Sequence, residues 1–173
     1  MTTKRDFTAT TLVVHRNRVL LHRHRKLGLV LPLGGHIESG ELPDEAAIRE
    51  VREESGLDVE LILPEPVWPL ADVRQLARPI AVLLEDIEPG HQHVDLIYAA
   101  TLKRPESESG HPAGSGTEEL MWLSSADIDL VSMPENVRVL SHYALRLVES
   151  SAAEPTDGVR NDLLPRPDRP ALA

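Results

Sequence analysis

The sequence contains no cysteine. This absence excludes disulfide bonds, metal sites built on thiolates and a cysteine nucleophile. The sequence also lacks any stretch that approaches the roughly 18 apolar residues of a membrane-spanning helix. Its first residues lead into a polar, strand-like run instead of the apolar core of a signal peptide. With no export or membrane signal visible, we expect a cytoplasmic protein without a membrane partner.

Positive charge is in the minority. The 18 lysine and arginine residues face 28 acidic residues, and the formal net charge is −10. Proteins hold nucleic acids largely through Lys and Arg on the phosphates, so we expect no nucleic-acid binding. A small nucleotide is compatible with this charge, because a divalent cation can stand between carboxylates and phosphates. Acidic residues concentrate between Asp44 and Glu60, and a short basic cluster covers residues 22–26. Such charge runs are more often simply solvated.

The length of 173 residues fits one domain that can bury a core without covalent cross-links. We place this domain at residues 1–150. Residues 151–173 are rich in Ala, Pro and Asp and show no periodicity. They are therefore expected to form an irregular C-terminal tail.

Hydrophobic periodicity and turn residues predict strands interleaved with helices. Strands are expected at 8–15, 18–24, 29–32, 58–62, 79–86, 94–102 and 119–123. Helices are expected at 42–55, 125–130 and 134–149. Turn or loop residues mark 16–17, 89–90, 64–69 and 105–116. This alternation favours an α/β fold, an α/β/α sandwich around a mixed central β-sheet.

The chemistry is concentrated in residues 35–57. On a helix that advances about 100° per residue, Glu50, Glu53 and Glu54 share one face. Carboxylates packed in this way repel one another unless cations neutralise them. Oxygen ligands on a rigid element suit Mg²⁺ or Mn²⁺. Arg49 is expected to point to a different side of the helix and to pair with Glu41. A solvated acidic face is the alternative for an isolated Glu-Glu pair, and the surrounding spacing decides between them.

The segment from Gly35 to Leu57 resembles the Nudix box of the MutT-like Nudix hydrolases. That box reads Gly, five residues, Glu, seven residues, Arg-Glu, an aliphatic, any residue, Glu-Glu, any residue, Gly and an aliphatic. Every specified place is filled, by Gly35, Glu41, Arg49, Glu50, Val51, Glu53, Glu54, Gly56 and Leu57. At a background usage of roughly 6% per residue type, the seven fixed letters alone arise by chance at about 10⁻⁹ per starting position.

The resemblance covers roughly residues 8–148. Nudix proteins typically present a hairpin, a Pro/Gly-Gly approach, a later strand and an acidic residue before a Trp strand. The matching segments here are 8–24, 32–35, 93–98 and 118–122. The domain at 1–150 is therefore expected to be a Nudix hydrolase domain, whereas the Pro-rich insert at 63–70 and the tail lie outside the pattern.

The resemblance implies hydrolysis of a phosphoanhydride bond in a nucleoside diphosphate linked to another group, with Mg²⁺ or Mn²⁺ as cofactor. It implies that roughly one to three ions are held against the diphosphate. The implied ligands are three carboxylates and one backbone carbonyl, from Glu50, Glu53, Glu54 and Gly34.

The implied catalytic residues are Glu50, Glu53 and Arg49. Glu53 or Glu50 is expected to accept the proton of the attacking water, because a base must lie within hydrogen-bond reach of it. Some members of the family take the base from a later loop, so Glu118 or Glu119 is the alternative base or extra ligand. Arg49 is expected to act with Glu41 as a structural support of the site.

Several residues are candidates for contacts with the substrate from their position in the sequence alone. Basic residues after the second strand lead towards the Gly-Gly pair and are candidates for phosphate contacts, namely Arg23, Arg25 and Lys26. His36 follows the first glycine of the box and is a candidate to face the substrate. Simple solvation is the more frequent outcome for each of these residues.

Other aromatic and histidine residues have weaker claims. His91 and His93 have a spacing that can grip a metal, but histidines in a turn are usually solvated. Trp68 lies in the proline-rich loop and is a candidate to stack on a base. Trp122 lies between Met121 and Leu123 and is expected in the core.

Several functions share this box. The expected partner is a small-molecule nucleotide, either a nucleoside triphosphate, a nucleotide sugar or ADP-ribose, or a dinucleoside polyphosphate. Loops outside the box decide among them. A catalytically silent nucleotide-binding or regulatory module is the alternative, although such proteins usually carry a broken box. An isomerase on the same fold would usually require a cysteine. Many relatives are dimers, so a homodimer is one expected form, which the sequence itself does not decide.

Overall fold

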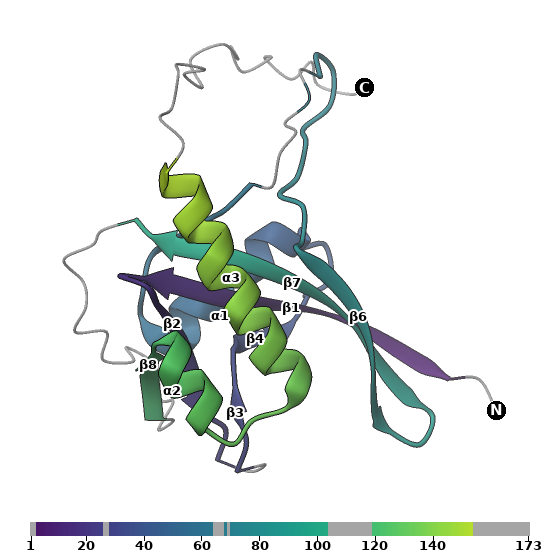
Figure 1. Cartoon of the computed structure of the whole chain (residues 1–173). Helices are drawn as coiled ribbons and strands as arrows, with labels where there is room; N and C mark the ends of the chain where they lie inside the picture. Colours follow the sequence, from purple (N-terminus) through teal and green to yellow (C-terminus); the bar gives the residue numbers. More distant parts are fainter. Residues whose placement is uncertain (1–2, 26–27, 64–67, 69, 104–118, 154–173) are drawn as a thin grey trace, which may run out of the picture.

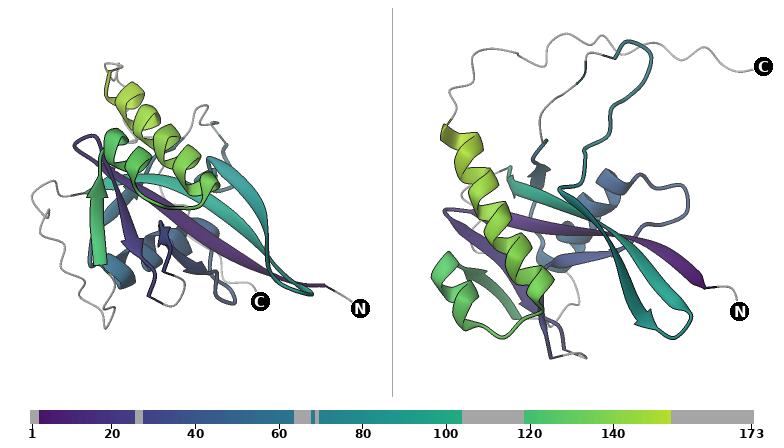
Figure 2. Two further views of the ribbon diagram at one scale, coloured as in Figure 1. Left: turned by 60° about the horizontal axis from the view of Figure 1, so that its bottom comes forward. Right: turned by 45° about the vertical axis from the view of Figure 1, so that its right-hand side comes forward.

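The computed structural model describes residues 3–25, 28–63, 68, 70–103 and 119–153. A mixed β-sheet lies between helices on its two faces (Figure 1). Helix α1 (Pro43–Ser55) packs on one face, and α3 (Glu135–Ala153) packs on the other beside α2 (Ser125–Leu130). Figure 2 shows these two layers on opposite sides of the strands. The α/β/α sandwich expected from the sequence is therefore confirmed.

The sheet is built around two long neighbouring strands. Its strands are β1 (Lys4–His15), β2 (Arg18–Arg23), β3 (Val30–Leu31), β4 (Leu33–His36), β5 (Val59–Leu61), β6 (Ala81–Glu88), β7 (His91–Leu102) and β8 (Glu119–Leu123). Within the described residues, the order is β3-β2-β1-β7-β5, with β4 joined to β1, β6 to β7 and β8 to β2. Strands β1 and β7 run parallel, whereas the other paired strands are antiparallel.

The hairpin between β1 and β2 is confirmed. Arg16 and Asn17 form its turn with φ values of 46° and 57°, the left-handed backbone that a tight hairpin turn needs. Strand β1 begins at Lys4, four residues before the expected start at residue 8. The polar segment at its beginning is extended because it pairs with β7, from Lys4 opposite His91 onwards.

Pro32 divides the strand that was expected at 29–32. Proline has no backbone N–H to donate, so the chain leaves β3 at Leu31 and begins β4 at Leu33. The glycine pair therefore lies in a strand, where Gly34 faces Thr10 and Gly35 faces Ala9 of β1. This pairing fixes the position of the two glycines beside α1.

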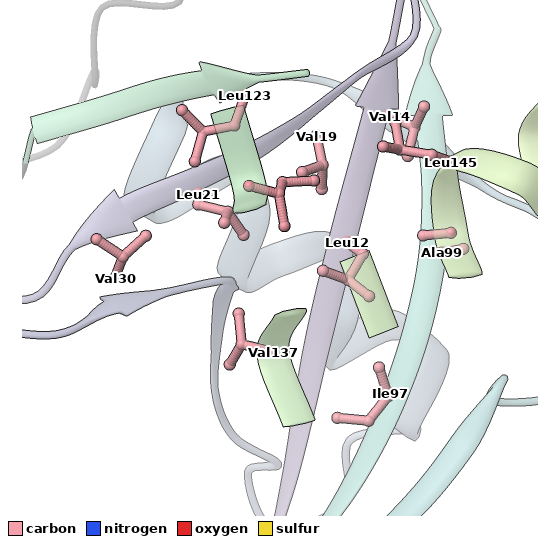
Figure 3. Close-up of a cluster of buried hydrophobic side chains, with 12 residues drawn as sticks. Leu12, Val14, Val19, Leu21, Val30, Ile97, Ala99, Leu123, Val137 and Leu145 are labelled. Atoms are coloured by element: carbon pink, nitrogen blue, oxygen red, sulfur yellow. The ribbon is translucent and has the colours of Figure 1, made fainter. Parts of the chain in front are cut away.

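Two apolar layers hold the helices on the sheet. On the α3 side, buried strand residues such as Leu12, Ile97 and Ala99 belong to one cluster with Val137 and Leu145 of the helix (Figure 3). On the α1 side, Val51 lies in a cluster with Val13, Leu33 and Ala100. Burial of one Val or Leu side chain contributes about 1.5–3 kcal/mol. These layers make the sheet and α1 a rigid support for side chains at their edges.

Two expected boundaries are wrong. Strand β7 begins at His91, not at residue 94, so His91 and His93 belong to a strand and not to the turn at 89–90. Helix α3 continues to Ala153, past its expected end at residue 149. The hydroxyls of Ser150 and Ser151 donate to the carbonyls of the preceding turn, both at 2.9 Å. The remainder of the tail, 154–173, and the loop at 105–116 lie outside the described residues.

None of the helices that the structure describes is both long enough and apolar enough to cross a membrane.

Candidate functional site

The acidic segment of the sequence forms α1. Pro43 occupies the first turn, where no backbone N–H is needed, and Gly56 ends the helix at φ 72°. The apolar face of the helix packs on the sheet, because Ala47 and Val51 are fully buried and Ile48 packs beside Val51. Burial of this face leaves the acidic residues on the part of the helix that faces β4 and the loop before the helix.

Arg49 connects four parts of this region. Its guanidinium donates to both carboxylate oxygens of Glu41, at 2.7 and 3.0 Å, which confirms the expected pair. It also donates to Glu50 at 2.7 Å, to Glu53 at 3.2 Å and to the carbonyl of His36 at 3.0 Å. The expectation that Arg49 points away from the acidic face is therefore wrong. A guanidinium carries five donors on a long stem, so it turns back over its own helix.

One guanidinium is thus shared among three carboxylates. Its hydrogen bonds to Glu41 are the main reason that the pKa of Arg49 is raised. The same contact lowers the pKa of Glu41, which also accepts from the backbone N–H of Glu38 at 3.0 Å. Glu41 is therefore held as an anion that ties the loop to the helix. The shared charge on Arg49 leaves the cluster with Glu50 and Glu53 electronegative.

Both glycines of β4 lie against carboxylates of α1, but only at Gly35 would a side chain collide with one. The N–H of Gly34 donates to Glu54 at 3.0 Å. In an antiparallel strand the N–H and C=O of one residue point to the same side, which makes the Gly34 carbonyl a candidate ligand beside Glu54. At Gly35, an added Cβ would lie 2.5 Å from Glu50 Oε1. At Gly34 an added Cβ would instead lie 2.6 Å from the carbonyl oxygen of Ala9, so Gly35 makes room for Glu50 and Gly34 makes room for β1.

These residues fit a hard divalent cation. The candidate donors are carboxylate oxygens of Glu50, Glu53 and Glu54 and the carbonyl of Gly34, which are the ligand types that Mg²⁺ and Mn²⁺ prefer. Glu54 contacts β4 through the N–H of Gly34, and Arg49 holds Glu50 and Glu53 together. The packing of the Glu50 carboxylate on Gly35 supports a cation site. Arg49 neutralises only part of the negative charge there, and a cation would neutralise the remainder.

Arg23 and Glu119 form an ion pair with each other. They face each other across β2 and β8, with Arg23 Nε 3.9 Å from Glu119 Oε2, and both side chains are exposed. Arg25 is exposed in the turn after β2. Lys26 and Glu118, the other candidates in this group, lie outside the described residues.

His36 contacts a different set of side chains. It ends β4 with its side chain 61% exposed, 3.9 Å from the carboxylate of Asp6. Its ring centroid is 4.9 Å from that of His93. His36 and Asp6 also line a depression of about 540 Å³ beside the loop that leads into α1, together with Phe7 and Glu38. This depression is a candidate place for part of a ligand.

The two tryptophans differ. Trp122 packs against the buried cluster on the α1 side, as expected. Trp68 is 57% exposed, and its backbone N–H donates to Gln75 at 2.9 Å.

A buried carboxylate on β7 was not identified from the sequence. Asp95 accepts hydrogen bonds from the hydroxyls of Thr8 at 2.9 Å and Thr10 at 2.8 Å. Burial raises its pKa, against the effect of these hydrogen bonds. Burial, and then the charge of Asp95, raise the pKa of Glu85 on β6, which accepts from Asn136 of α3 at 3.1 Å. The available signal was one acid within the apolar run 94–102.

A group of Asp6, His91 and His93 was also missed as a group. The sequence indicated the spacing of the two histidines but not their strand or their partner in β1. The signal lies in the register, which places Asp6 opposite His93. Burial lowers the pKa of His93, and the neighbouring His36 and His91 lower it further.

Comparisons with known proteins agree with this geometry. A family model described as NUDIX domain matches residues 5–143. A NUDIX-family hydrolase from Clostridium perfringens is 36% identical, with a TM-score of 0.72, and the match covers 84% of this chain and 99% of that one. No curated protein matches the chain.

Two more distant structures share the fold alone. A MutT NUDIX hydrolase from Burkholderia pseudomallei is 22% identical, with a TM-score of 0.58, over 84% of this chain and 98% of that one. A structure described as UDP-X diphosphatase is 16% identical, with a TM-score of 0.57, over 88% of this chain and 66% of that one.

Proposed function

This chain belongs to the Nudix hydrolase family, and from that membership we propose that it uses Mg²⁺ or Mn²⁺ to cleave a phosphoanhydride bond in a nucleoside diphosphate linked to another group. The family acts in general on compounds with such linkages. The observation that carries the proposal is the approach of Glu54 to Gly34 and of Glu50 to Gly35, with Glu53 joined to Glu50 through Arg49.

We assign the cation to the oxygens of Glu50, Glu53, Glu54 and the Gly34 carbonyl. When bound, Mg²⁺ supplies neutralisation of the phosphoryl oxygens and a lower pKa for the attacking water. Arg49 holds Glu41 and Glu50 in place, and Glu41 in turn anchors the loop between β4 and α1. These contacts supply preorganisation, because the carboxylates are positioned before the substrate arrives.

Glu53 is the favoured general base. Its side chain is 60% exposed and its contact with Arg49 is 3.2 Å, so its carboxylate can meet a water molecule and accept a proton. Glu50 is 14% exposed, bonded to Arg49 at 2.7 Å and packed on Gly35, which suits a fixed ligand better. Glu119, exposed beside Arg23, is the alternative base.

Product analysis tests the proposal. The full chain is incubated with nucleoside triphosphates, nucleotide sugars, ADP-ribose and dinucleoside polyphosphates, with Mg²⁺ or with EDTA. We expect cleavage of one class into two phosphorylated products, with Mg²⁺ only. Cleavage that persists unchanged in EDTA would contradict the metal assignment, and no cleavage of any class would favour a binding module.

A further inference from the structure

Three potential metal ligands meet on one face of two neighbouring strands, apart from the glutamates of α1. Asp6 lies in β1, and His91 and His93 lie in β7, where alternate residues point to the same face of the sheet. The parallel register places Asp6 opposite His93. In Figure 1 this part of β1 runs beside the β6–β7 hairpin, near the N-terminus. One ligand atom from each of the three residues lies within 4.8 Å of the others.

The surroundings add a third imidazole to this group. His91 Nε2 lies 2.9 Å from Asp6 Oδ2, and His36 Nε2 lies 3.9 Å from the same oxygen. The ring of His93 is 5.1 Å from that of His91 and 4.9 Å from that of His36, measured between centroids. Three strands, β1, β4 and β7, therefore bring a carboxylate and three imidazoles to one place.

The Nε2 atom of His93 provides an independent observation. It is buried, and the described part of the chain offers it no hydrogen-bond partner. Buried polar atoms of side chains are nearly always paired, so an orphaned ring nitrogen requires an explanation. A cation that accepts the lone pair of this nitrogen would supply the missing partner.

We propose that Asp6, His91 and His93 form a binding site for a Zn²⁺-class divalent cation, with His36 as a fourth ligand. Imidazole nitrogens suit Zn²⁺ and the other late first-row metals, whereas Mg²⁺ prefers an all-oxygen set such as the glutamates of α1. Ligand atoms around tetrahedral Zn²⁺, at bonds of about 2.0–2.2 Å, are about 3.3 Å apart. The three ligand atoms already lie within 4.8 Å of one another, and the exposed side chain of His36 has room to turn towards them.

Lys4 is the group that a cation would displace. Its ammonium lies 2.7 Å from Asp6 Oδ2, and its side chain is 68% exposed. A surface ion pair of this kind contributes little, so the lysine can swing into solvent. Lys4→Gln is therefore expected to bind Zn²⁺ more tightly than the wild-type chain, by up to about 5-fold.

The test is a Zn²⁺ titration of the full chain, with any histidine tag removed, against a chromophoric chelator in excess Mg²⁺. We expect one Zn²⁺ per chain. The double variant His91→Gln/His93→Gln should lose affinity on the order of 100-fold or more, since even a lost partner of a metal ligand commonly costs 10–100-fold. His142→Gln is the matched control, because His142 also contacts a carboxylate, Asp129 at 2.9 Å, but lies on α3.

Two further measurements make the outcome decisive. Glu54→Gln should keep the Zn²⁺ affinity, so a failure of the proposed hydrolase site would leave this result unchanged. The second measurement uses the wild-type chain and so does not depend on the folding of a variant. There Zn²⁺ should shift the ring ¹⁵N resonances of His91 and His93 but not those of His142. Absence of stoichiometric Zn²⁺, equal affinity in the double variant, or shifts confined to other histidines would overturn the proposal.

Discussion

A methyl group at Gly35 would collide with Glu50. An added Cβ would lie 2.5 Å from Oε1, 2.6 Å from Cδ and 2.7 Å from Oε2 of that carboxylate, whereas ordinary contact begins at 3.4 Å. In Gly35→Ala the carboxylate must therefore retreat by roughly 0.9 Å to reach ordinary contact. A ligand or base displaced by about 1 Å loses its alignment. The retreat would also disturb the 2.7 Å bond to Arg49.

A displacement of about 1 Å in a catalytic constellation commonly costs about 100-fold in rate. We therefore expect kcat/KM of Gly35→Ala to fall by about 100-fold, equivalent to about 2.7 kcal/mol of transition-state stabilisation. Stability should change by about 1 kcal/mol or less, because Gly35 lies in a β-strand, which alanine tolerates, and the clash is with the end of a flexible side chain. Steady-state kinetics and thermal unfolding measure the two quantities.

Two other glycines are controls for this experiment. At Gly90, with φ 83°, an added Cβ meets nothing within 4 Å, so Gly90→Ala should lose about 1–2 kcal/mol of stability from backbone strain and keep its activity. At Gly34 an added Cβ would lie 2.6 Å from the carbonyl oxygen of Ala9, so Gly34→Ala should damage the sheet itself. Wild-type kcat/KM in a folded Gly35→Ala would refute the assigned role of Glu50.

Two further variants test the supports of the site. Arg49→Lys cannot reproduce the paired bonds to Glu41, so we expect kcat/KM to fall about 10–100-fold together with a lower melting temperature, and retention of both would show that the guanidinium is dispensable. Burial raises the pKa of Asp95, so the folded state disfavours the ionised carboxylate. The free energy of unfolding should therefore fall as the pH rises from the ordinary pKa of 3.8 through the raised pKa. Asp95→Asn should reduce this loss in urea denaturation series at several pH values, with the like-signed contribution of Glu85 remaining; an unchanged pH profile would contradict the assignment.

The helix with its acidic face was predictable because its signals are local. Apolar spacing, Pro43 and Gly56 define α1, and the i, i+3, i+4 spacing places Glu50 and its neighbours on one face. The pairing of Arg49 with Glu41 followed from the same segment. The additional reach of Arg49 to Glu50 was not predictable, because it depends on the rotamer that the loop and β4 impose.

The register of the sheet was harder to predict from the sequence. Asp95 bonds to Thr8 and Thr10, which are 87 and 85 residues away, and the contact of Asp6 with His91 also spans 85 residues. A sequence pattern carries no information about which polar ends of strands lie side by side. The early starts of β1 and β7 have this common cause, and for the same reason the histidine group was not visible in the sequence.

The turnover of Glu54→Gln tests the central claim most directly. Glu54 accepts a hydrogen bond from the N–H of Gly34, and a glutamine carbonyl can still accept it, so the fold should remain intact. Removal of the negative charge should weaken the cation site. We expect Mg²⁺-dependent hydrolysis to fall by about 100-fold or more with an unchanged melting temperature, as for the loss of one strong charge-stabilising group. Unchanged turnover in this variant would contradict the assignment of the acidic face of α1 as the metal site.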